Sequence, residues 1–130
     1  MIGADTRTYL LTQSSVTSLL SSTTAIYPIF LPQSHAGFPA MTYSQDADDD
    51  FHLLEGVSTL YEALVSLDIY SYGYEINREI ADAVRAALVG FSGTFGSVTA
   101  QHVRCSRDID LYESDTRLHH TSLQFLIAYS

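Results

Sequence analysis

The chain has 130 residues, 46% of them hydrophobic, and a formal net charge of -9 at pH 7. Its size fits one globular domain over residues 1–130, the longest apolar run is too short for a membrane-spanning helix, and its single cysteine excludes an intrachain disulfide. All six basic residues are arginines, which excludes catalysis by a lysine side chain. A chain with this much negative charge is also a poor candidate for binding in a groove of nucleic acid.

The N-terminal part of the chain predicts a helix followed by an irregular strand. Asp5–Leu20 has apolar residues at a three-to-four spacing, and Asp5 is placed to cap its first turn. Ala25–Leu31 is predicted to be a strand. Pro28 and Pro32 lack an amide proton, which places this strand at a sheet edge or makes it irregular. The segment before residue 13 lacks the apolar run of a signal peptide, so we expect a protein that stays in a reducing cytoplasm or in a particle assembled there.

An acidic segment, Gln45–Glu55, follows a short predicted strand at Ala40–Ser44 and is predicted to be the tip of a long hairpin. Its carboxylates should keep it extended and solvated until a partner orders it. A calcium loop needs a fixed ligand spacing with a glycine at its bend and a bidentate acid at its end. In that spacing this segment has neither the glycine nor the bidentate acid. We interpret it as a solvated loop, with a metal site as the alternative, for which the candidate ligands are Asp46, Asp48, Asp49, Asp50 and His52.

The middle of the chain changes from the period of a strand to that of a helix. Tyr61–Ile69 alternates with a period of two, and its second face is also partly apolar, which predicts a central strand. The next segment has the apolar stripe of an amphipathic helix, formed by Ile76, Ile80, Val84 and Leu88. Gly90 is placed to end this helix in a left-handed conformation.

The C-terminal third predicts a glycine-rich turn at Phe91–Ser97 and then an antiparallel hairpin. Its strands are Val98–Cys105 and Leu118–Tyr129, with the reversal at Glu113–Thr116. One face of the last strand is apolar, with Leu123, Phe125, Ile127 and Tyr129. The predicted order α-β-β-β-α-β-β indicates an α+β fold, a mixed and mostly antiparallel sheet of about five strands packed by two helices.

No set of residues has the spacing of a catalytic site. His119 and His120 are adjacent on a predicted strand and point to opposite faces, so they cannot share a metal. His102 and Cys105 are three residues apart and also face opposite ways, and Cys105 is predicted to be a small core residue. The glycine-rich segment at 92–96 follows a helix instead of preceding one, the wrong order for a phosphate loop. We predict no enzyme, no catalytic residue, no metal and no cofactor.

Three motifs resemble a known family in their order and spacing. They are Ile26–Gln33 (IYPIFLPQ) closing with Phe38–Tyr43 (FPAMTY), Ile80–Leu88 (IADAVRAAL) with Gly90-Phe91 after it, and Arg107–Glu113 (RDIDLYE) before the last strand. Together they resemble the tail-completion proteins of long-tailed double-stranded DNA phages, also called tail terminators or head-to-tail joining proteins. The resemblance runs from about Leu10 to Tyr129.

The resemblance implies a structural virion protein that assembles, usually as a hexameric ring, at the neck of a siphovirus. The ring would stop growth of the tail tube at its head-proximal end and join it to the head connector, after assembly in the host cytoplasm. Its partners would be copies of itself, the tail tube protein and the head connector or stopper protein. DNA would cross the channel without specific binding, and no membrane is expected.

The surfaces that meet neighbouring subunits should carry the function, because the family has no catalytic residues to carry over. We expect these surfaces to include Asp46, Asp48, Asp49, Asp50, His52, Pro28, Pro32 and Tyr112. Two alternatives stay open at this point. One is another ring-forming head–tail connector or tail-tube subunit, and the other is a small metal-dependent hydrolase built on the acidic segment.

Overall fold

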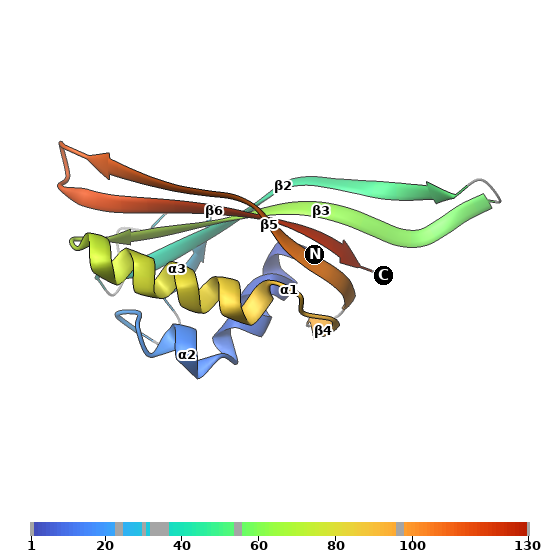
Figure 1. Ribbon diagram of the computed structural model, residues 1–130, viewed down its shortest axis with the longest axis horizontal. Coiled ribbons are helices and arrows are strands. Elements are labelled where there is room, and N and C mark those ends of the chain that lie inside the picture. The colour runs from blue at the N-terminus through green and yellow to red at the C-terminus, as the bar shows by residue number, and fades with distance from the viewer. Residues whose placement is uncertain are drawn as a thin grey trace.

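The computed structural model describes residues 2–22, 25–29, 31, 37–53, 56–95 and 98–129, with side chains for all of these except 47–53, 56–60 and 95. Within these ranges there are three helices and six strands (Figure 1). The helices are α1 (Ile2–Leu11), α2 (Ser14–Thr17) and α3 (Tyr74–Leu88). The strands are β1 (Ile26–Pro28), β2 (Ala40–Leu53), β3 (Gly56–Ser71), β4 (Gly93–Phe95), β5 (Val98–Glu113) and β6 (Leu118–Tyr129).

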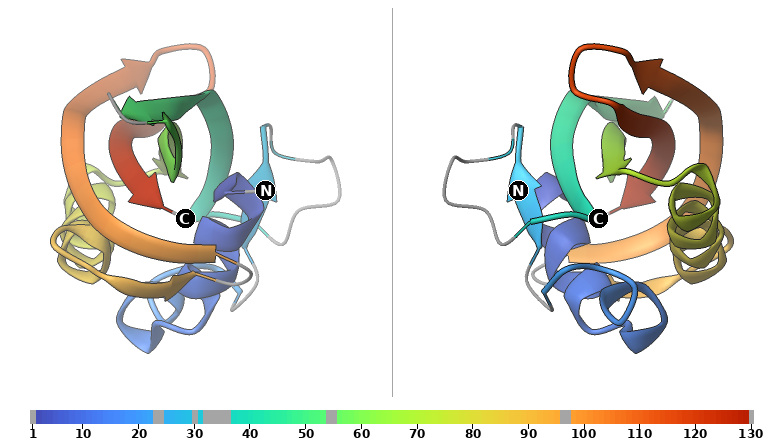
Figure 2. Two further views of the ribbon diagram at one scale, coloured as in Figure 1. Left: turned by 90° about the vertical axis from the view of Figure 1, so that its right-hand side faces the viewer. Right: turned by 90° about the vertical axis from the view of Figure 1, so that its left-hand side faces the viewer.

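The strands form one mixed sheet in the order β1-β2-β3-β6-β5-β4. β1 pairs with β2 in parallel, and the other neighbours are antiparallel. The helices lie against one face of the sheet, and the sheet curls into a half-barrel when viewed along its long axis (Figures 1 and 2). The α+β prediction is confirmed, including the edge position of the strand that contains Pro28. None of the described helices is long and apolar enough to cross a membrane.

The core lies between the helices and the two central strands. The predicted alternation is confirmed, since the side chains that face the helices are buried at Ala63, Val65, Leu67 and Ile69 of β3 and at Leu123, Phe125 and Ile127 of β6. Burying one face of each strand in this way is the main contribution of a sheet to folding. β3 is therefore central, as the sequence predicts.

Helix α3 contributes Ile80, Val84 and Leu88 to the core, but the prediction for Ile76 is wrong. Ile76 is 43% exposed, and Asn77 is fully buried instead. The Asn77 side chain is held by Ser71, 2.6 Å from its Oδ1, and its Nδ2 donates to the carbonyl of Ile69 at 3.4 Å. Because these bonds tie the first turn of the helix to the end of β3, a polar residue takes the position that an apolar stripe would have filled.

The N-terminal helix is shorter and starts earlier than predicted. α1 already begins at Ile2, so Asp5 lies buried inside it and is not its cap. The helix ends at Leu11, where the amides of Thr12 and Gln13 bond three residues back to Tyr9 and Leu10. Such tight bonds are common at helix ends, and the serines and threonines that follow are weak helix formers. The predicted single helix is therefore α1 followed by the short α2.

Two segments predicted to be loops are strands. β2 continues from Ser44 to Leu53 and pairs with β3 as far as Leu53 with Gly56, so the hairpin prediction is confirmed and the loop prediction for 45–53 is wrong. Residues 93–95, predicted to be part of a turn, form β4, which pairs with β5 at the edge of the sheet. β5 itself continues past Cys105, the predicted end of the strand, to Glu113. In each case a neighbouring strand supplies the pairing, which outweighs local composition. Residues 54 and 55 lie outside the described residues.

Gly90 has the left-handed conformation that the sequence predicts, with φ +78°, and it follows Val89, the C-cap residue of α3. Its amide donates to the carbonyl of Val103 at 2.9 Å. A Cβ built on Gly90 would meet no atom within 4 Å, so only the backbone conformation opposes a side chain there. We expect Gly90→Ala to lower the free energy of unfolding by about 1 kcal/mol in urea denaturation. Gly90→Asn should lose less, because asparagine tolerates this conformation, and equal losses for both variants would contradict the explanation.

Candidate assembly surfaces

The contact residues predicted from the sequence lie on three separate surfaces. Pro28 ends β1 at one edge of the sheet, Asp46 lies on β2, and Tyr112 lies near the end of β5. Asp48, Asp49, Asp50 and His52 have backbone positions on β2, but their side chains lie outside the described residues, as does all of Pro32. The residues therefore do not converge on one site.

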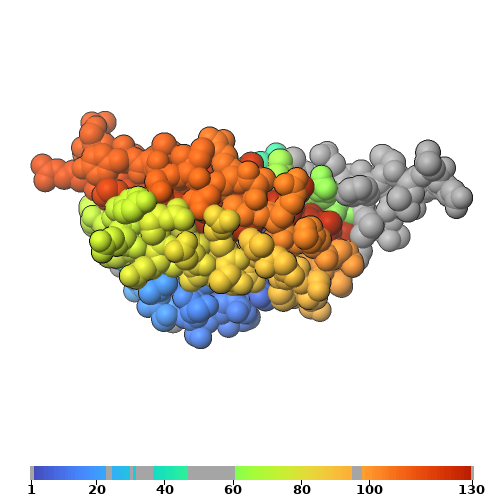
Figure 3. Space-filling model, viewed as in Figure 1, coloured from blue at the N-terminus to red at the C-terminus, as the bar shows by residue number. Residues whose placement is uncertain are grey.

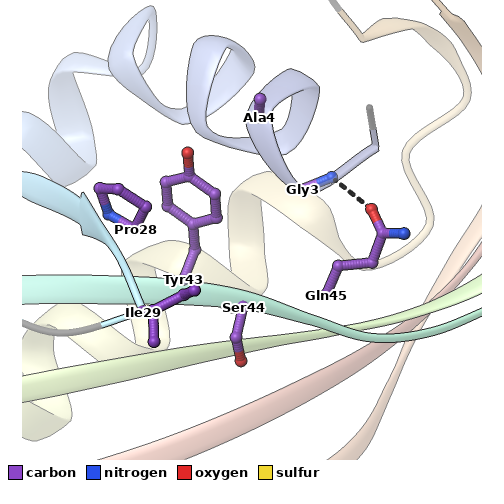
Figure 4. Close-up of a pocket in the computed structure, with 7 residues that line it drawn as sticks. All are labelled: Gly3, Ala4, Pro28, Ile29, Tyr43, Ser44 and Gln45. Carbon is purple, nitrogen blue, oxygen red and sulfur yellow. Dashed lines mark hydrogen bonds between the residues drawn. The ribbon is translucent and has the colours of Figure 1, made fainter.

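A cleft of about 490 Å³ opens beside Pro28, between the start of α1 and the strands β1 and β2 (Figure 4). Tyr43 points from β2 toward α1, and the Oε1 atom of Gln45 accepts a hydrogen bond from the amide of Gly3 at 3.4 Å (Figure 4). The lining residues carry no charged side chain; they are Gly3, Ala4, Pro28, Ile29, Tyr43, Ser44 and Gln45. This cleft can receive an apolar group, and it has no acid or base for catalysis.

Ile29 stands beside the cleft in an unusual conformation. Its φ is +65°, a region that β-branched residues rarely adopt, and its side chain is 73% exposed. The Ile29 amide donates to the carbonyl of Tyr43 at 2.7 Å, which holds the backbone in place. Strained residues of this kind cluster at functional positions. The sequence predicted an irregular strand here from the two prolines, but no local pattern indicated the positive φ of Ile29.

β3 ends, α3 begins and β5 approaches its turn at the same end of the sheet (Figure 1). These segments carry exposed aromatic side chains. We call this surface the aromatic end and define it by Tyr72, Tyr74, Ile76 and Tyr112. The ring of His119 joins two of them, with its centroid 6.2 Å from Tyr74 and 4.9 Å from Tyr112. Exposed groups of large aromatic residues are typical of protein contact surfaces.

Helix α3 is fastened to β5 by an ion-pair cluster, and the two elements lie side by side (Figure 3). Arg78 contacts both carboxylate oxygens of Asp108, at 2.8 and 3.1 Å, and Arg85 contacts Oδ2 of Asp108 at 2.9 Å. The hydrogen bonds from Arg78, with help from Arg85, outweigh partial burial and lower the pKa of Asp108. These charges stabilise the fold, so neither arginine is free to bind a partner.

A polar network crosses the face of the sheet that the described helices leave open. Asp46 accepts hydrogen bonds from Ser44 at 3.1 Å, from Ser66, and from Nε2 of Gln124 at 3.0 Å. Ser106 donates to Gln124, which extends the network from β2 to β5. Partial burial alone would raise the pKa of Asp46, but the three hydrogen bonds outweigh it and the pKa is lowered. Asp46 thus serves to join the strands.

The histidines and the cysteine that the sequence offers as metal ligands or nucleophiles lie apart from one another. His120 contacts Asp68 at 2.8 Å on the open face, whereas His119 lies with the aromatic end, so the prediction of opposite faces is confirmed. Cys105 packs against the core but is only half-buried, and it lies beside a bulge in β5. Its thiol donates to the carbonyl of Arg107. Its prediction as a core residue is confirmed only in part. Among the side chains that the structure describes, no three ligands are placed to hold a metal ion.

Comparison with known proteins assigns the chain to a family. No curated protein sequence matches it. A chain from a solved structure, the virion of a native gene transfer agent (GTA) particle, is 18% identical with a TM-score of 0.75, and the match covers 98% of this chain and 93% of that chain. At this identity the match shows a shared fold. The family model "Tail completion protein gp17", which describes a structural and non-enzymatic family, matches residues 6–130. The chain belongs to the tail completion protein gp17 family.

Proposed function

We propose that six copies of this protein form a ring that caps the head-proximal end of a phage tail tube and joins it to the head connector. The observation that carries this proposal is the match to the tail completion family over residues 6–130. A subunit of a closed ring needs two different contact surfaces, one for each neighbour. The cleft beside Ile29 and the aromatic end lie at separate places on the molecule, and we propose them as these two surfaces.

We propose that the contact residues predicted from the sequence take part in these subunit contacts. Pro28 lines the cleft and Tyr112 belongs to the aromatic end. Asp46 contributes to the open face of the sheet, and Asp48, Asp49, Asp50, His52 and Pro32 are retained on their sequence positions alone. A net charge of -9 supports a channel that DNA crosses without specific binding. A strongly basic lumen in the assembled ring would contradict that last point.

Electron microscopy of the protein alone and mixed with tail tubes tests the proposal. The expected result is a ring at one end of each tube, with no further tube growth in the presence of added tube subunits. Incorporation along the whole tube would identify a tube subunit instead. Rings that bind only to head connectors would identify a connector component and would also contradict the capping role.

A further inference from the structure

A bulge in β5 turns Arg107 to the open face of the sheet. Arg107 comes two residues after Cys105, which packs against the core, so a regular strand would point both side chains toward the helices. The pairing with β6 shifts by one residue between them, and Arg107 lies opposite Gln124 on the open face. β-Bulges that re-aim a side chain in this way are common next to functional sites.

Two arginines of the open face have no acidic partner among the residues that the structure describes. They are Arg104 and Arg107, and both are exposed. Arg78 and Arg85 are instead held by Asp108. A guanidinium group can bind a carboxylate through two parallel hydrogen bonds. Arg104 and Arg107 are therefore suited to bind a carboxylate of a second molecule.

Helix α3 carries exposed carboxylates on the side that faces away from the sheet. Glu75 and Glu79 are one helical turn apart and exposed, whereas Ile80 and Val84 are buried in the core. Neither glutamate forms an ion pair within the described residues. The fold uses neither carboxylate, so both are available to a partner.

The contacts between α3 and β5 show that Glu79 and Arg107 lie at nearly the same level along the molecule. Arg78 binds Asp108 at 2.8 Å, and helix and strand lie side by side (Figure 3). Glu79 follows Arg78 in the chain, and Arg107 precedes Asp108. Glu79 therefore lies on the outer side of the helix, level with Arg107 on the open face.

The exposed apolar groups of the two surfaces are also level. Tyr74 and Ile76 are exposed at the start of α3, and the Tyr74 hydroxyl donates to Asp110 of β5 at 3.4 Å. Leu111, the next residue of β5, is exposed and pairs with His120, whose side chain lies on the open face. Each surface thus has apolar groups at the same end of the molecule and a charged group further along, and these two charges have opposite signs.

We propose that the outer side of α3 in one copy binds the open face along β5 in the next copy, with Glu79 against Arg107 and Ile76 beside Leu111. Each copy presents its helix to one neighbour and its sheet to the other, a head-to-tail contact that closes into a ring when the rotation between copies allows it. Copies with a net charge of -9 repel one another, so opposite charges at this point favour one orientation of the contact. This inference rests on the ring in the proposed function and adds the β5 surface to the contacts named there.

A charge swap across the contact tests it. We expect Arg107→Glu alone and Glu79→Arg alone each to weaken self-association by roughly tenfold or more, because like charges then face each other. These two changes alter the net charge in opposite directions, so an effect of net charge cannot weaken both variants. Both changes in one chain should restore association. Arg117→Glu, in the β5–β6 turn, is the control outside the contact and should leave association unchanged.

Three measurements separate this inference from the proposed function. Sedimentation gives the association constant, electron micrographs show capping of tail tubes, and urea unfolding checks that each variant is folded. If either reversed variant associates and caps tubes like wild type, or if the swapped chain does not recover, the contact is wrong and the capping role stands where wild type caps tubes. If both reversals weaken association and the swap restores it, but wild type does not cap tubes, the contact stands and the capping role is wrong. If wild type neither associates nor caps tubes, both are overturned.

Discussion

Replacing Phe125 by alanine is expected to lower the free energy of unfolding by about 3–5 kcal/mol. The Phe125 side chain is fully buried in the middle of β6, opposite Val65 of β3 and Cys105 of β5. Strands on both sides fix the backbone, so the cavity left by the ring cannot close. Urea denaturation measures the loss as a lower midpoint with an unchanged slope.

The adjacent Leu126 provides the control, because it is half-buried on the opposite face of the same strand. Leu126→Ala should cost no more than about 2 kcal/mol, since it removes less buried area and leaves no enclosed cavity. Phe125→Leu keeps most of the volume and stays measurable if the alanine variant does not fold. Equal losses at Phe125 and Leu126 would show that the alternation along β6 does not decide which side chains form the core.

The sequence predicted best those elements whose own residues decide their structure. β6 matches its predicted bounds, Leu118–Tyr129, because its alternation is regular from Thr121 to Tyr129. The helix before Gly90 was equally clear, since an amphipathic stripe and a glycine stop indicate the same end. Only its first turn was misjudged, where Asn77 is buried through bonds to another element.

The failures concern residues whose structure depends on partners far away in the chain. Residues 48–50 have the composition of a loop, yet they lie on β2 because Tyr61, Glu62 and Ala63 pair with them. The second half of β5 depends in the same way on β6. The contact surfaces were predicted only in part for the same reason. The conformation of Ile29 and the aromatic end arise from packing, and no local spacing in the sequence indicates them.

Removing the Asp108 side chain is expected to lower the free energy of unfolding by about 1–3 kcal/mol. This is less than the loss expected for a fully buried ion pair, because Arg85 is partly exposed to solvent. Asp108→Ala breaks the bonds to both arginines of α3 and leaves their positive charges close together. Asp82→Ala is the matched control. It removes one exposed carboxylate at 3.4 Å from Arg78 within the same helix, so it should cost no more than about 0.5 kcal/mol. Urea denaturation of both variants near neutral pH measures the difference.

The acid dependence of stability then tests whether the Asp108 effect is electrostatic. Hydrogen bonds from Arg78, and then from Arg85, hold the pKa of Asp108 below its unfolded value. Its contribution is therefore complete above the unfolded pKa of about 3.9 and is lost as the pH falls through the folded pKa. The gap in unfolding free energy between wild type and Asp108→Ala should be constant above about pH 5 and should shrink below about pH 4. Asp46, whose pKa is also lowered, is present in both proteins and cancels in this difference. A gap that stays constant into the acid range would mean that Asp108 acts through packing and not through its charge.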